Sequence, residues 1–176
     1  MSILKVARMG HPVLRKRTVP LSPTELSGSE IQKLIDDMFE TMREYEGIGL
    51  AAPQVHHSSR LFVAGVDDSD SDFLPIVMVN PEIEVIGSSV EEDWEGCLSI
   101  PDVRGKVSRS QEIRVRSLDR HGKPQKMTAF GFPARVIQHE TDHLDGILFL
   151  DRMSSFESLT YQDEYSRYGD KEGSAN

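Results

Sequence analysis

Residues 138–143, which read QHETDH, limit the fold and the chemistry of this chain more than any other stretch. His139 and His143 are four positions apart, and side chains at i and i+4 lie on one face of an α-helix. Two imidazoles on one face can bind a single metal ion. Glu140 is turned by about 100° from His139, so its carboxylate can reach a water molecule on that ion. The pattern therefore predicts a helix with a hydrolytic metal site and Glu140 as proton shuttle.

The flanks of this segment predict that the helix is buried, because residues 134–137 and 147–150 are largely apolar. A buried histidine pair needs polar partners, and a metal ion supplies one for each ring. Asp142 and Asp145 are predicted to accept hydrogen bonds from the imidazole N–H groups that face away from the metal.

A catalytic metal site of this kind needs a third protein ligand and an open position. One candidate is Cys97, since Leu98 and Ile100 beside it predict a strand that holds the thiol in place. The other is a downstream carboxylate, Asp163 or Glu164, in a polar segment that predicts mobility. A lone buried cysteine is more often an ordinary core residue. The strand context nevertheless favours Cys97 over the downstream acids, and both alternatives stay open.

Apolar periodicity predicts an α+β fold. Residues 29–46 have the spacing of one amphipathic helical face, with Ser29 as N-cap and Gln32 completing a capping box. The two β-rich runs on either side of Gly87 are predicted to pair as a hairpin. Strands are predicted over residues 3–6, 61–66, 75–80, 83–86, 90–94, 113–117 and 125–130. We expect small antiparallel or mixed β-sheets packed around a central metal-binding helix, with a second, amphipathic helix near the N-terminus.

Four stretches predict loops or a frayed end. Residues 18–28 and the acidic residues 67–72 read as loops, and the chain from residue 164 onward reads as a polar tail. Residues 47–54 (GIGLAAPQ) form either a helix-to-strand connector or a loop that brings its backbone close to a ligand, with Gln54 as an amide donor.

Composition sets outer limits on the function. A chain of 176 residues predicts one domain with a core of its own. We expect its catalytic part over residues 1–153, followed by a C-terminal extension, residues 154–176, with a flexible end. A net charge of −9 argues against a stable nucleic-acid complex. One cysteine allows no intrachain disulfide, and no run approaches the ~20 apolar residues of a membrane span. We expect a cytoplasmic protein, or an organellar one if a transit peptide has been removed.

Three segments resemble the signature motifs of the peptide deformylase family, in the same order: residues 47–54 (GIGLAAPQ), 95–99 (EGCLS) and 138–143 (QHETDH). Residues 3–14 and 146–153 also resemble that family, so the resemblance covers residues 3–153. One such motif is a moderate signal, but all three in order are highly specific.

The resemblance implies a metal-dependent hydrolase that removes the formyl group from the N-terminal N-formylmethionine of newly synthesised polypeptides and releases formate. It implies that Cys97, His139 and His143 hold the metal. Metal-activated water is then the nucleophile, with Glu140 as general base and acid. The family typically uses Fe²⁺, with Zn²⁺, Ni²⁺ or Co²⁺ able to substitute, whereas the ligand types alone would indicate zinc.

The resemblance also implies substrate contacts. Gln54 and the backbone N–H of Leu98 would bind the formyl oxygen, and the backbone around Ile48 and Gly49 would pair with the substrate peptide as an added strand. Val136, together with Phe132, shares the helical face of the two histidines. These two residues either line an apolar pocket for the methionine side chain or belong to the ordinary core.

The expected partners are N-formylmethionyl nascent peptides, with a transient ribosome contact and no membrane. Many family members have a long C-terminal helix that can contact the ribosome, but residues 154–176 show little helical period, which puts such a contact in doubt. Two other functions stay open on the residues: a metallopeptidase that uses a downstream acid, and a noncatalytic metal-binding or redox-sensing module.

Overall fold

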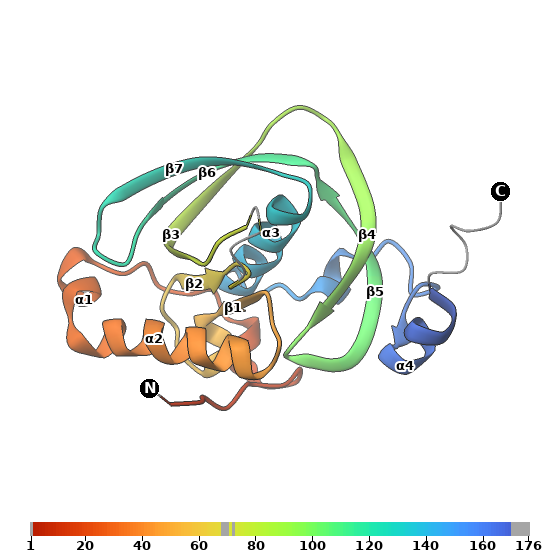
Figure 1. Ribbon diagram of the computed structural model, residues 1–176, viewed down its shortest axis with the longest axis horizontal. Helices are drawn as coiled ribbons and strands as arrows, with labels where there is room; N and C mark the ends of the chain where they lie inside the picture. The colour runs from red at the N-terminus through yellow and green to blue at the C-terminus, as the bar shows by residue number, and fades with distance from the viewer. Residues whose placement is uncertain (1, 68–70, 72, 170–176) are drawn as a thin grey trace.

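The computed structural model describes residues 2–67, 71 and 73–169. Two antiparallel sheets enclose a central helix, α3 (Phe132–Leu144), as Figure 1 shows. The five-stranded sheet has the order β1-β2-β3-β6-β7, and the three-stranded sheet has the order β4-β5-β8. The strands are β1 Gly49–Ala51, β2 Leu61–Ala64, β3 Ile76–Val85, β4 Val90–Cys97, β5 Ile100–Ser110, β6 Glu112–Leu118, β7 Pro124–Phe130 and β8 Thr160–Tyr161. The expected α+β class with a central helix is confirmed.

The five-stranded sheet is covered by a helix on each face. Side chains alternate along a strand, so Leu61 and Val63 of β2 join the core under helix α2 (Ser29–Glu44), while Phe62 and Ala64 join the core under α3. All four residues of β2 are fully buried. This two-sided burial fixes α3 against the sheet and leaves its other side facing the β4–β5 hairpin.

Helix α2 is the amphipathic helix that the apolar spacing predicts, but its ends differ from the prediction. Gly28 is the N-cap and makes no side-chain cap hydrogen bond, so Ser29 is not the cap. Gln32 donates instead to the carbonyl oxygens of Leu26 and Arg120. The predicted loop before it also contains a short helix, α1 (Pro23–Ser27), closed by a capping box.

The predicted hairpin around Gly87 is wrong. Strand β3 lies in the five-stranded sheet and β4 in the three-stranded sheet, so residues 86–89 cross between the sheets. The return crossing, from β5 to β6, lies beside it, because Gln111 donates its N–H to the carbonyl of Ser89. Alternating apolar residues identify each strand but do not specify its partner.

The N-terminal residues 3–6 form no strand. They run extended across the molecule, where the N–H of Leu4 donates to Thr41 Oγ1 and the N–H of Ala7 to the carbonyl of Gln54. The predicted acidic loop at 67–72 lies largely outside the described residues.

The chain beyond residue 153 is ordered as far as the structure describes it. Strand β8 pairs with β5 and leads into helix α4 (Gln162–Glu164), which continues as a helical turn, Tyr165–Gly169. Residues 164–169 are helical where the sequence predicts a polar tail, and residues 170–176 lie outside the described range, so a flexible end stays a prediction. A catalytic domain ending at residue 153 stays a prediction.

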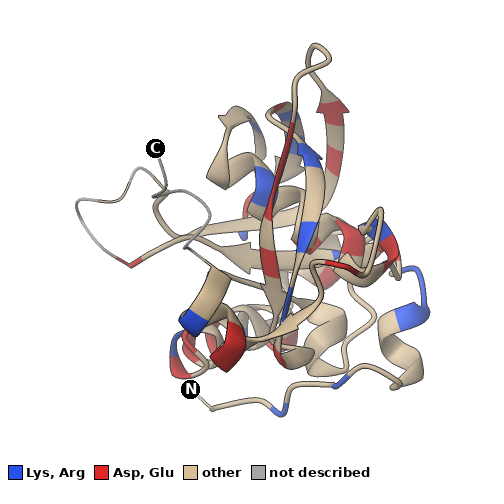
Figure 2. Cartoon of the chain, turned by 90° about the vertical axis from the view of Figure 1, so that its right-hand side faces the viewer, with Lys and Arg blue, Asp and Glu red and all other residues tan. Residues whose placement is uncertain are grey.

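Acidic and basic residues are both spread along the chain in Figure 2, where strands and helices carry both signs. Within the described residues, no helix is long and apolar enough to cross a membrane.

Candidate metal centre

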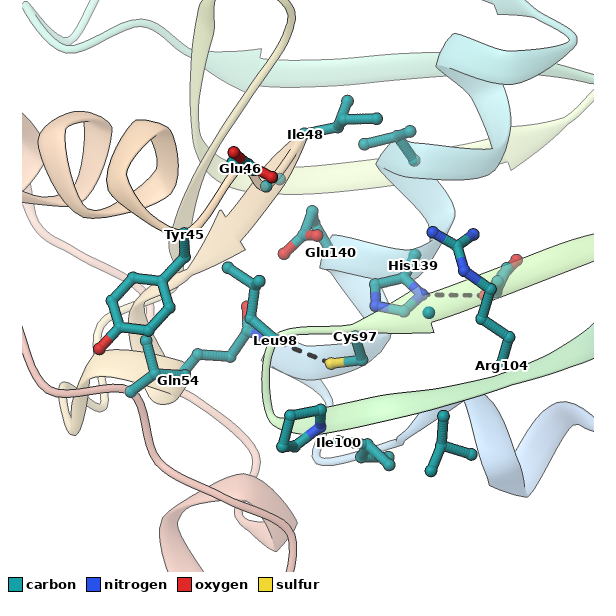
Figure 3. A pocket seen from close by; sticks show the side chains of 18 of the residues that line it. Tyr45, Glu46, Ile48, Gln54, Cys97, Leu98, Ile100, Arg104, His139 and Glu140 are labelled. Atoms are coloured by element: carbon teal, nitrogen blue, oxygen red, sulfur yellow. Dashed lines mark hydrogen bonds and ion pairs between the residues drawn. The ribbon is translucent and has the colours of Figure 1, made fainter. Parts of the chain in front are cut away.

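Cys97, His139 and His143 come together at the centre of the molecule. One ligand atom from each lies within 4.8 Å of the others, and no other group of three or more metal-ligating side chains is found among the described residues. The Sγ atom of Cys97 is 3.2 Å from Nε2 of His143. Figure 3 shows the thiol and the His139 ring approaching from different elements, β4 and α3. The i, i+4 spacing predicted from the sequence brings both imidazoles to one face of α3.

The thiol is positioned by a tight turn. Cys97 is the last residue of β4 and pairs with Ile100, the first residue of β5, so Leu98 and Ser99 form the turn between them. The N–H of Met9 donates to the carbonyl of Ser99 and holds the turn in place. Leu98 therefore lies in the turn, whereas the sequence predicts it in a strand.

The alternative third ligands are not part of this cluster. Glu164 pairs with Arg167 at 3.0 Å, and Asp163 accepts the N–H of Glu164. Both acids belong to α4, beyond β8. The cluster of described metal-ligating groups contains the cysteine and neither carboxylate.

Glu95 is the acid that contacts and orients one histidine of the cluster, and sequence reasoning missed this role. Its Oε2 is 2.9 Å from Nδ1 of His139, and its carboxylate also accepts hydrogen bonds from Arg109 and Arg135. A strand places residues i and i+2 on the same face, so the position of Glu95 two residues before Cys97 is the signal that could have revealed it.

The predicted role of Asp142 and Asp145 is wrong. Asp142 accepts hydrogen bonds from Arg109 and Arg152, and Asp145 pairs with Arg60. Both side chains have arginine partners and neither is bonded to an imidazole. A helical wheel shows which residues share a face, but it does not show which distant arginines reach them.

Buried charges shift the pKa values of the cluster. Burial alone would raise the pKa of Glu95, but hydrogen bonds from His139 and Arg109 outweigh it and lower the pKa to about 2. Burial would likewise raise the pKa of the Cys97 thiol, but the two imidazoles lower it well below its usual value. A thiol must lose its proton to bind a metal, so the surroundings favour the ligand form of Cys97.

Glu140 is buried beside the cluster without a hydrogen-bond partner for its Oε2 among the described residues. Burial raises the pKa of Glu140 to about 7, although the imidazoles of His139 and His143 act in the opposite direction. Gly49 makes room for it, because a Cβ atom at residue 49 would lie 2.3 Å from Oε1 of Glu140. Glycine is required here for close approach and not for its backbone angles.

The Gln54 side chain is held with its amide nitrogen toward the thiol. The N–H of Ala51 donates to Oε1 of Gln54 at 2.8 Å, which fixes the orientation of the amide. Nε2 then lies 3.5 Å from Sγ of Cys97 and 3.2 Å from Oγ of Ser99. The segment 47–54 is not only a loop, because it contains β1 and a 3₁₀ turn, Ala52–Val55.

A cavity of about 840 Å³ opens onto these groups. Ile48, Gly49, Phe132 and Val136 are among its lining residues, together with Cys97 and others. Val136 is buried, whereas the Phe132 ring is half exposed at the rim. Val136 also belongs to the core under the five-stranded sheet, as the core alternative predicts, and its role as a wall for the methionine side chain stays a prediction.

The family model described as polypeptide deformylase matches residues 3–158. The chain belongs to the polypeptide deformylase family. It is therefore a hydrolase that acts on a linear amide and removes the formyl group from the N-terminus of nascent peptides, by a metal-dependent reaction.

Individual relatives agree with this assignment. Peptide deformylase 2 of Nostoc sp. is 39% identical over 168 residues, which is 93% of each chain. Peptide deformylase 2 of Xanthomonas axonopodis pv. citri is 47% identical over 155 residues, 88% of this chain and 89% of that protein. The class I type b peptide deformylase of Acinetobacter baumannii, solved with Met-Ala-Ser bound, has a TM-score of 0.82 at 40% identity. It covers 87% of this chain and 100% of its own.

A metal-dependent deformylase needs a metal site, and the cluster of Cys97, His139 and His143 has suitable ligand groups. Thiolate and imidazole are common ligands of divalent transition metals, and the buried Oε2 of Glu140 has no hydrogen-bond partner among the described residues. The residues present therefore fit a catalytic metal ion.

Proposed function

We propose that Cys97, His139 and His143 hold the catalytic metal of this deformylase and that Glu140 is its general base and acid. The observation that carries the proposal is the meeting of three ligand atoms within 4.8 Å beside a buried carboxylate. The proposed native metal is Fe²⁺, with Zn²⁺, Ni²⁺ or Co²⁺ as substitutes. Such an ion, when bound, acidifies water and polarises the formyl carbonyl.

Glu140 is the proposed group that accepts and returns the proton during the reaction. Its pKa of about 7 lets the carboxylate accept a proton from the attacking water and return it near neutral pH. The proton then passes to the amine nitrogen that leaves when the formyl C–N bond breaks. Burial excludes bulk water from this transfer, and Gly49 leaves the space in which the carboxylate sits.

Gln54 and the backbone N–H of Leu98 are the proposed donors to the formyl oxygen, where negative charge develops. The Gln54 amide is oriented before substrate arrives, because the N–H of Ala51 holds its oxygen. A preorganised donor of this kind is typically worth about 3 kcal/mol of transition-state stabilisation.

The substrate peptide is proposed to bind along β1. This strand is at the end of the five-stranded sheet, paired with β2 on one side only. Ile48 and Gly49 line the cavity on its other side, so a peptide can add as a further strand through main-chain hydrogen bonds. Val136 and Phe132 then offer an apolar wall to the methionine side chain.

The proposed partners are N-formylmethionyl nascent peptides and, transiently, the ribosome. We place the enzyme in a bacterial-type cytoplasm, or in an organelle if a transit peptide has been removed. Among the described residues 154–169 there is no long helix for such a ribosome contact to use.

Metal content and formate release test these assignments together. The protein is purified anaerobically, loaded with Fe²⁺ and given formyl-Met-Ala-Ser. Glu140→Gln is expected to keep its iron and to lose at least about 10²-fold in kcat, because proton transfer by a positioned side chain contributes about 10²–10⁴-fold. Cys97→Ala is expected to lose iron, while Glu164→Ala, which removes the alternative third ligand, is expected to keep its iron. Iron retained by Cys97→Ala and lost by Glu164→Ala would overturn the ligand assignment.

A further inference from the structure

The segment after the family match forms part of the active-site cavity. The match ends at residue 158, yet Gln162 lines the same cavity as Cys97 and His139. Strand β8 brings it there, because Tyr161 pairs with Val103 and Thr160 with Arg104 of β5. In Figure 1 this segment lies against β5, on the side of the hairpin away from the five-stranded sheet.

Arg104 is the residue that this segment holds. Its Nε donates to Oε1 of Gln162, and its guanidinium lies 5.3 Å from the centre of the Tyr165 ring. The Tyr165 ring in turn packs edge to face on Trp94, with ring centres 4.8 Å apart. An arginine fixed by a hydrogen bond and an aromatic face has lost most of its freedom before any ligand binds.

The position of Arg104 suits a contact with substrate. It is paired with Gly96, next to the thiol of Cys97, and a Cβ atom at residue 96 would lie 3.6 Å from Cγ of Arg104. The Arg104 side chain therefore lies next to β4 at Gly96, which has no side chain to compete with it. Figure 3 shows it rising from β5 beside His139.

Arg104 differs from the other arginines near the cluster. Arg109 and Arg135 are buried and bonded to Glu95. Within the described residues, the two Nη groups of Arg104 have no hydrogen-bond partner, so its outer donors remain available. Arg104 is among the residues that line the cavity, and the proposed peptide path along β1 leads into the same cavity.

We propose that residues 160–165 form a wall of the substrate cleft, in which Gln162 and Tyr165 position Arg104 to bind a main-chain carbonyl oxygen beyond the methionine. Gln162 is thus a positioning residue and acts through Arg104. The proposal rests on the deformylase function and on the peptide path along β1. It predicts that Arg104 raises the affinity for substrates with residues after the methionine and leaves the affinity for shorter substrates unchanged.

The test compares two substrates with neutral ends: formyl-methionine amide and formyl-Met-Ala-Ser amide. Gln162→Ala is expected to raise KM for the longer substrate about tenfold, with kcat and the short substrate nearly unchanged. Gln162→Glu keeps an acceptor for Nε of Arg104 and is expected to restore the low KM. Arg167→Gln, which alters an exposed ion pair just after this segment, is the matched control and should behave as wild type.

A double-mutant cycle shows whether Gln162 acts through Arg104. In an Arg104→Ala background, the further change Gln162→Ala is expected to have no additional effect on KM. The inference is overturned if Gln162→Ala raises KM equally for both substrates, lowers kcat, or adds its full effect in that background. If the wild-type enzyme released formate from neither substrate, the proposed site assignments would fail instead.

Discussion

At the scale of single residues, the site depends on two residues, Glu95 and Gly49, that lie in the sequence motifs but whose roles the motifs do not reveal. Residue type and spacing predict His139 and His143 as metal ligands and favour Cys97 as the third, and the family resemblance implies the full set. Glu95 is not predicted in this way, because its role requires knowing that β4 lies across from α3. Gly49 is similar: its sequence context indicates close approach to some ligand, whereas the group that approaches is the carboxylate of Glu140.

Replacing Gly49 by alanine tests that packing. The new Cβ would lie 2.3 Å from Oε1 and 2.7 Å from Cγ of Glu140, so the carboxylate must move. A displacement of about 1 Å can cost about 10²-fold in rate, so we expect kcat to fall by at least about tenfold with iron content unchanged. Steady-state kinetics and elemental analysis measure this, and an unchanged kcat would show that Glu140 does not need its present position.

Glu95→Gln tests how His139 is oriented. Loss of the carboxylate removes a charged acceptor at Nδ1 of His139, and such changes typically weaken metal binding about 10–100-fold. Asp145→Asn is the matched control, because Asp145 pairs with Arg60 and not with an imidazole. Competition with a chelator reports both affinities. Equal affinities in the two variants would contradict the role given to Glu95.

At the scale of elements, periodicity was a reliable guide to helices and a poor guide to strand pairing. Helix α2 has the predicted apolar face, and α3 is the predicted helix that carries His139 and His143. The runs flanking Gly87 are both strands, but they belong to different sheets. Two strands joined by four residues commonly form a hairpin. Here β3 and β4 pack in different sheets, and local sequence does not show which sheet a strand joins.

Gly146, which follows α3, is needed both for its positive φ and for its close contact with the backbone of Arg15. Gly146 has a φ of +75°, and a Cβ atom there would lie 2.8 Å from the backbone carbon of Arg15. Gly87 has a similar φ of +70° but open space around it. Gly87→Ala is therefore expected to cost about 1 kcal/mol of stability from strain alone, and Gly146→Ala clearly more.

Urea unfolding of both variants measures this difference. The larger loss at Gly146 would show that the N-terminal segment packs closely on the end of the metal helix. Equal losses would mean that the contact with Arg15 relaxes without cost.

At the scale of the whole molecule, the fold brings together parts of the chain that are distant in sequence. The thiol comes from a hairpin, the imidazoles from a late helix and the amide of Gln54 from a 3₁₀ turn after β1. Sequence motifs reveal that these parts are present. They do not reveal that the C-terminal residues return to β5, because β8 is only two residues long and its neighbours are polar.

The central claim concerns the inner coordination sphere of the metal. X-ray absorption at the iron edge of the anaerobically loaded enzyme measures it directly. We predict one sulfur and two imidazole nitrogens, with the sulfur signal lost in Cys97→Ser. A sphere of only nitrogen and oxygen in the wild-type enzyme, unchanged by that substitution, would contradict the account.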